Sequence, residues 1–127
     1  IYNVCLSEIY KTELDPRISF LHEPNYRALS LHLDLAEIFK PILGDTLIFN
    51  MLNKKEITAK DFQTDAGRIK FSNDAVQKIE LKMIARLGET VSLGGRDLTW
   101  RQVIRREANQ IKKCICEDAP YEGLVWR

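Results

Sequence analysis

The spacing of apolar residues between positions 29 and 53 is the clearest structural signal in the sequence, and two patterns overlap there. Every second residue from Leu29 to Leu35 is leucine, which indicates a strand. A longer series recurs every three or four residues, as on the buried face of a helix. Its members are Leu31, Leu35, Ile38, Phe39 and Ile42. The longer series favours a helix from Ser30 to Asn53, which we expect Pro41 to kink because its ring removes a backbone hydrogen bond.

Two shorter helices are predicted on either side of this segment. Residues 1–13 have the pattern of a helix end, which the prolines of the following segment interrupt. A second helix is expected up to Leu87, capped by a polar residue within positions 72–74 and ended by Gly88. Its buried side is predicted to contain the apolar residues at helical spacing, namely Val76, Ile79, Met83 and Leu87, with Ile84 beside them.

The last third of the chain predicts a long amphipathic helix. It begins at Thr99, which forms a capping-box pattern with Gln102. Its apolar side consists of Trp100, Val103, Ile104, Ala108, Ile111 and Ile115. Residues 62–71 read as a β-hairpin with a tight turn at Ala-Gly, and residues 117–127 as an extended tail. The predicted fold is therefore mainly α, with a minor β-hairpin.

Length and composition indicate a single domain, residues 1–127, of a soluble globular protein. No apolar run approaches the roughly 20 residues of a transmembrane helix, so no membrane association is expected. The three cysteines, Cys5, Cys114 and Cys116, do not form an even disulfide framework and favour reduced thiols in a cytoplasmic protein. The sequence opens at Ile1 in the middle of a helical pattern, and we expect it to be a fragment of a longer chain.

Charge is distributed unevenly, although the net charge is only +1. Residues 1–66 contain 7 Lys and Arg against 10 Asp and Glu, whereas residues 67–127 contain 12 against 8. The basic residues of the second half recur on the outer faces of the predicted helices, at Lys78, Lys82, Arg86, Arg101, Arg105 and Lys112, with Arg106 and Lys113 alongside. Such stripes are typical of surfaces that bind phosphates, but a solvated helix face with interspersed Glu80 and Glu107 has the same pattern.

Asp34 and Glu37 form a candidate metal site with His22. The two carboxylates are three residues apart, so a helix presents them on one side. His22 lies on a proline-flanked loop that could fold over them. Carboxylates with one imidazole suit Mg²⁺ or Mn²⁺, which could activate a hydroxyl for attack on a phosphodiester. The alternative is an ordinary solvated helix, with His32 as a polar-face or interface residue.

An ordered motif runs through residues 14–45, LDPRISFLHEPNYRALSLHLDLAEIFKPILGD. The matching positions are Asp15, Pro16, Phe20, Leu21, His22, Ser30, Leu31, Leu33, Asp34, Leu35, Glu37, Phe39, Lys40, Pro41 and Asp45. This motif resembles the signature of the CRISPR-associated adaptation integrase family, the endonuclease subunit of spacer acquisition. The closing helix and aromatic tail, residues 95–127, resemble the family more loosely, so the resemblance covers most of the chain.

The resemblance implies a helical C-terminal catalytic lobe, preceded in the family by a β-rich N-terminal domain that is absent here. It assigns His22 and Glu37 as metal ligands and Asp34 as the accompanying catalytic acid. The family's third ligand is an upstream Glu, and neither Glu8 nor Glu13 lies in the required motif. We therefore expect this chain alone to bind metal weakly and to be inactive.

The resemblance further implies a metal-dependent DNA endonuclease and integrase, which joins 3′-hydroxyl ends of short DNA to the repeat array by transesterification. The implied cofactor is Mg²⁺ or Mn²⁺, and the implied partners are DNA, a second copy in a homodimer and a small CRISPR-associated protein of ferredoxin-like fold. Predicted DNA contacts are Arg27 and Lys40, which flank the acidic positions, with Arg101 and Arg105. The alternative hypothesis is a non-catalytic helical DNA-binding or assembly module.

Overall fold

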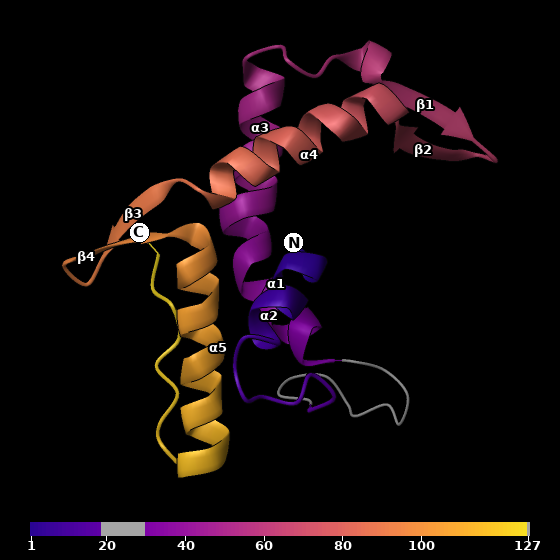
Figure 1. Ribbon diagram of the computed structural model, residues 1–127. Coiled ribbons are helices and arrows are strands. Elements are labelled where there is room, and N and C mark those ends of the chain that lie inside the picture. The colour runs from indigo at the N-terminus through magenta and orange to yellow at the C-terminus, as the bar shows by residue number, and fades with distance from the viewer. Residues whose placement is uncertain (19–29, 127) are drawn as a thin grey trace.

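The computed structural model describes residues 1–18 and 30–126, and the described chain is mainly helical, as predicted (Figure 1). The five α-helices are α1 (Tyr2–Ile9), α2 (Leu31–Phe39), α3 (Thr46–Asn53), α4 (Asn73–Leu87) and α5 (Trp100–Glu117). A π-helical turn, η1 (Lys40–Asp45), joins α2 to α3, and a 3₁₀ turn, η2 (Ala59–Asp61), precedes the first strand. Two antiparallel hairpins consist of β1 (Phe62–Asp65) with β2 (Arg68–Phe71), and β3 (Thr90–Leu93) with β4 (Arg96–Thr99). The described helices are too short or too polar to span a bilayer.

The helix predicted from Ser30 to Asn53 is present as α2, η1 and α3 in succession. Residues 31–35 are helical, so the strand interpretation of the alternating leucines was wrong. Pro41 is accommodated by the wider π-helical turn, in which the Thr46 hydroxyl donates to the Pro41 carbonyl at 2.9 Å. Arg86 from α4 donates to the next carbonyl, that of Ile42, at 3.2 Å. Side chains therefore supply additional hydrogen bonds to two carbonyls of the π-helical turn.

The main core lies between α1, α2 and α5, because each turns an apolar face toward the other two. Its fully buried members include Cys5 and Ile9 of α1, Leu35 and Phe39 of α2, and Ile104 of α5. The predicted apolar side of α5 is confirmed except for its last residue, Ile115, which is 40% exposed. The predicted cap is confirmed as well, since Thr99 Oγ1 accepts from the Gln102 amide and Gln102 Oε1 accepts from the Thr99 amide.

The predicted hairpin at residues 62–71 is confirmed, with Ala66 and Gly67 both at positive φ in its turn. A second hairpin, β3–β4, was missed by the prediction of a single one. Its turn is Gly94-Gly95, with φ values of 60° and 74°. Two glycines at positive φ are typical of a type I′ hairpin turn, so the local signal was present in the sequence.

Helix α4 is capped by Ser72, one of the three predicted candidates, whose Oγ accepts from the Ala75 backbone amide. Its predicted buried side is only partly correct: Leu87 is buried, whereas Val76 is 39% and Ile84 62% exposed. Figure 1 shows the reason, because α4 crosses α3 and extends beyond it, with one hairpin at each of its ends. Few of the described elements cover its length, so several of its apolar side chains remain exposed.

The C-terminal tail, residues 118–126, has no regular secondary structure and runs back along α5 (Figure 1). The rings of Trp126 and Trp100 lie 4.8 Å apart at an angle of 57°. Tyr121 Oη donates to the buried carboxylate of Glu107 at 3.2 Å. These contacts attach the tail to both the first and the middle turns of α5.

Candidate functional site

Glu37 is an accessible carboxylate at the end of α2. Its side chain is 49% exposed and accepts a hydrogen bond of 2.5 Å from Lys40 Nζ. The ammonium group of Lys40 also lies 4.7 Å from the centre of the Tyr2 ring. The hydrogen bond with Glu37 is the main cause that raises the pKa of Lys40. Glu37 is therefore presented to solvent beside a cation, within reach of an external ligand.

Asp34 lies one turn before Glu37 and is buried. It belongs to the first turn of α2, where the helix dipole favours a negative charge. The predicted i, i+3 placement of the two carboxylates on one helix is confirmed, but their environments differ. Asp34 is suited to supporting the site from within, whereas Glu37 is suited to binding a ligand.

His32 lies next to this pair but packs against Tyr2, with the two rings edge to face and 6.3 Å apart. Its Nδ1 atom is buried and has no hydrogen-bond partner within the described residues. Burial lowers the pKa of His32, and the nearby Asp34 carboxylate acts in the opposite direction. Burial thus favours the neutral imidazole. The interpretation of His32 as a polar-face or interface residue stays a prediction.

His22 and Arg27 lie outside the described residues, so their predicted roles as metal ligand and phosphate contact stay predictions. Within residues 1–18 and 30–126, no three side chains of His, Cys, Asp or Glu lie together in a way that could hold a metal ion. Of the predicted metal ligands, the structure describes only Glu37.

Arg101 and Arg105, the predicted DNA contacts on α5, lie beside a buried carboxylate. Glu8 of α1 is fully buried and accepts from Arg105 Nε at 2.9 Å and from Lys11 Nζ at 2.7 Å, with Arg101 Nη1 at 3.7 Å. Burial disfavours the charged form of Glu8, but the hydrogen bonds from Lys11 and Arg105 outweigh it and lower its pKa. The ion pairs stabilise the contact between α1 and α5. They also occupy part of the charge and hydrogen-bonding capacity that Arg101 and Arg105 could offer to a phosphate.

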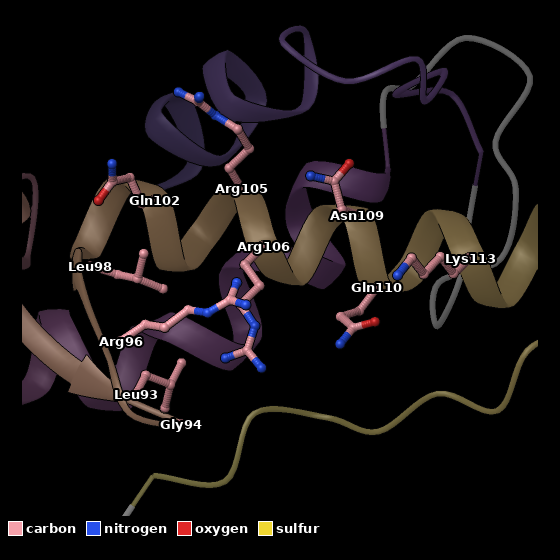
Figure 2. Close-up of a pocket in the computed structure, with 10 residues that line it drawn as sticks. All are labelled: Leu93, Gly94, Arg96, Leu98, Gln102, Arg105, Arg106, Asn109, Gln110 and Lys113. Carbon is pink, nitrogen blue, oxygen red and sulfur yellow. The ribbon is translucent and has the colours of Figure 1, made fainter.

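A second basic surface lies between α5 and the β3–β4 hairpin. It is a groove of about 580 Å³. Its lining residues are Leu93, Gly94, Arg96, Leu98, Gln102, Arg105, Arg106, Asn109, Gln110 and Lys113 (Figure 2). The sequence analysis assigned no ligand-binding role to Arg96 or to the amides Gln102, Asn109 and Gln110, although the recurrence of these three amides at helical spacing on α5 was a usable signal.

The comparisons with known proteins agree on one family. The family model described as CRISPR associated protein Cas1 matches residues 1–83. CRISPR-associated endonuclease Cas1 2 of Thermodesulfovibrio yellowstonii is 40% identical over 127 residues, which cover 98% of this chain and 38% of the relative. CRISPR-associated endonuclease Cas1 of Clostridium perfringens is 42% identical over 126 residues, with the same two coverages. The chain thus spans 38% of the length of these two relatives.

Solved structures agree with the sequence comparisons. A Cas1 protein from Thermotoga maritima superposes with a TM-score of 0.84 and 32% identity, over 98% of this chain and 38% of that one. A casposase bound to an integration product superposes with a TM-score of 0.78 over the same shares of the two chains, at 24% identity, which shows a shared fold.

Proposed function

Because the chain belongs to the Cas1 family of CRISPR-associated proteins, we propose that it is the catalytic lobe of a metal-dependent DNA endonuclease and integrase. The relatives named endonucleases support the nuclease class. The observation that carries the proposal is the position of Glu37, an exposed carboxylate at the end of α2 with Asp34 buried one turn behind it.

The cofactor proposed is Mg²⁺ or Mn²⁺, for which a carboxylate oxygen is a suitable ligand. Glu37 fits this role because it is accessible and already binds a cation, the ammonium group of Lys40. His22 would supply the second ligand, as the family motif implies. When bound, the metal would polarise a phosphodiester and lower the pKa of an attacking hydroxyl.

The proposed reaction joins a DNA 3′-hydroxyl to the repeat array by transesterification. The 3′ oxygen loses its proton and forms a bond to phosphorus, while the bond from phosphorus to the departing 3′ oxygen breaks and that oxygen takes up a proton. Lys40 lies beside Glu37 with its side chain 36% exposed, so it can contact the non-bridging phosphate oxygens. The proposed partners remain a second copy of the protein and a small CRISPR-associated protein of ferredoxin-like fold.

Glu37→Gln in the full-length protein tests the catalytic role. The amide keeps the shape of the side chain but is a poor ligand for a hard cation. Strand transfer should fall by more than about 100-fold, since even residues outside the ligand shell cost 10–100-fold. DNA affinity and the melting temperature should change little because the side chain is exposed. Glu80→Gln, at an exposed position of α4, is the matched control and should retain full activity.

The second candidate function is a non-catalytic DNA-binding or assembly module, favoured by the basic groove beside α5. In that case Glu37→Gln would leave strand transfer intact, and removal of groove cations would abolish DNA binding. Strand transfer by the Glu37→Gln protein at the normal rate would therefore exclude the catalytic proposal and leave the module.

A further inference from the structure

The outer face of α5 carries a stripe of polar side chains that ends beside the β3–β4 hairpin. Its members, Gln102, Arg106, Asn109 and Lys113, follow the spacing i, i+4, i+7 and i+11 and so lie on one side of the helix. The opposite side of α5 is buried in the core. The hairpin contributes Arg96, whose guanidinium extends toward the same groove as that of Arg106 (Figure 2).

Of the four cations that line this groove, Arg96, Arg106 and Lys113 differ from Arg105 in their pairing. Arg96, Arg106 and Lys113 make no ion pair with any residue of the described chain, and no carboxylate lines the groove. The fourth cation of the lining, Arg105, is instead bound to Glu8, and Lys112, which does not line the groove, is paired with Glu13. The charges of Arg96, Arg106 and Lys113 are therefore uncompensated by ion pairs within the described chain and available to a ligand.

Glu107, the acidic residue of α5 next to Arg106, does not form an ion pair with the Arg106 guanidinium. Glu107 attracts Arg106 electrostatically, but its carboxylate is buried and accepts a hydrogen bond from Tyr121 of the tail. Arg106 itself is exposed. Its guanidinium thus keeps its hydrogen-bond donors for the groove.

From this arrangement we infer that the groove binds the sugar-phosphate backbone of a nucleic acid, at a surface separate from Glu37 and Lys40, neither of which lines it. Arginine binds phosphate oxygens through two parallel hydrogen bonds, and amide side chains donate to phosphate and sugar oxygens. Arg106 and Lys113 are seven residues apart, about 10 Å along the helix axis. That equals roughly three steps of 3.4 Å along the axis of the DNA duplex.

Backbone contacts of this kind do not read sequence, because every nucleotide carries the same phosphate. The groove itself indicates a nucleic-acid backbone. That this nucleic acid is DNA rests on the proposed function. Its position suits a surface that holds the duplex while the reacting phosphate lies elsewhere, at Glu37. The amides beside the cations favour a hydrogen-bonding polyanion over an acidic protein surface.

The test is the double substitution Arg106→Gln/Lys113→Gln in the full-length protein. Its affinity for a duplex of arbitrary sequence is measured by fluorescence anisotropy between about 50 and 200 mM salt, the range over which phosphate contacts are lost. The slope of log K against log salt should become less negative by about 1.8, from about 0.9 for each cation removed. The loss of affinity should be the same for unrelated sequences. Adding Arg96→Gln should make the slope less negative by about another 0.9.

Lys54→Gln/Lys60→Gln is the matched control, because it removes two exposed lysines that also make no ion pair within the described residues but lie outside the groove. An unchanged slope and affinity in the groove variant would overturn the inference, as would an equal change in the control. A groove variant with normal DNA binding that has lost a protein partner would overturn it in favour of an acidic protein surface.

The two proposals fail separately. Glu37→Gln with normal strand transfer removes the catalytic proposal and leaves the measured slope of the groove variant unaffected. An unchanged slope in the groove variant removes the second surface and leaves the catalytic test as it stands.

Discussion

Glu8 Oε2 on α1 accepts a hydrogen bond at 2.9 Å from Arg105 Nε on α5, across 97 residues of sequence. The carboxylate is fully buried, whereas the side chains of Arg105 and Lys11 are each more than 40% exposed. The two cations therefore keep part of their hydration, and Glu8 depends on them for its charge. This arrangement attaches the first helix to the last and makes Glu8 the charged centre of the α1–α5 contact.

Glu8→Gln should destabilise the protein because it removes the charge that both cations bind. The free energy of unfolding should fall by about 1.5–3 kcal/mol, the range for hydrogen bonds to charged groups. The lower part of that range is expected, since Lys11 and Arg105 can regain water. Urea denaturation followed by circular dichroism measures the change.

Glu13→Gln is the matched control for this prediction. Glu13 pairs with Lys112 in the same way, but its side chain is 85% exposed. Exposed pairs contribute little to stability, so this variant should unfold like the unmodified protein. Equal losses in the two variants would show that burial does not distinguish the two pairs.

Acid should destabilise the protein in part through Glu8. The folded-state pKa of Glu8 lies below its ordinary value of 4.5, so the folded protein binds this proton less readily than the unfolded chain. The resulting stability is fully present above about pH 4.5 and is lost as the pH falls through the folded-state pKa. The pH dependence of the denaturation midpoint between pH 7 and pH 3 should therefore be shallower in Glu8→Gln. If the denaturation midpoint of both proteins falls equally between pH 7 and pH 3, Glu8 does not contribute to the acid sensitivity.

Local chemistry explains which structural features were predictable. The caps at Ser72 and Thr99 were predicted because each involves residues within a few positions of one another. The resemblance in residues 14–45 is confirmed by the family match, since a long ordered motif needs no knowledge of the fold. The placement of Glu37 on a helix followed from the same segment.

Long-range pairing explains what was not predictable. Arg105 looked like a free cation on an outer helix face, and only the fold brings Glu8 beside it. Ile84 is 62% exposed although Met83 and Leu87 of the same helix pack against the core, and helical spacing alone did not reveal this difference. His22, outside the described residues, remains a prediction.

The contribution of Glu107 to stability should change with pH in the opposite direction from that of Glu8. Its burial raises its pKa, so the folded protein holds this proton more tightly than the unfolded chain does. Stability from this residue is present below the unfolded-state pKa and is lost as the pH rises through the folded-state pKa. Glu107→Gln keeps an acceptor for Tyr121 without the buried charge, and it should melt at a higher temperature than the unmodified protein at pH 7. A lower melting temperature at pH 7 would contradict the prediction.

The Gly94-Gly95 turn should be required for the orientation of Arg96, which follows it directly in β4. Both glycines have positive φ, and a Cβ at either position would meet no heavy atom within 4 Å. The cost of Gly94→Ala or Gly95→Ala is therefore one of backbone strain, about 1–2 kcal/mol at each position. Since the hairpin is small, the strain should loosen it and weaken DNA binding through Arg96, without the loss of a charge.

Gly88→Ala separates backbone strain from the mere addition of a methyl group. Gly88 has a negative φ, and its added Cβ would meet the Ala85 carbonyl oxygen at an ordinary 3.5 Å. This variant should keep its stability and its DNA affinity. Thermal melting and anisotropy on the three glycine variants measure both effects. If Gly95→Ala binds DNA as well as Gly88→Ala does, the contribution of Arg96 to DNA binding does not depend on the conformation of the turn.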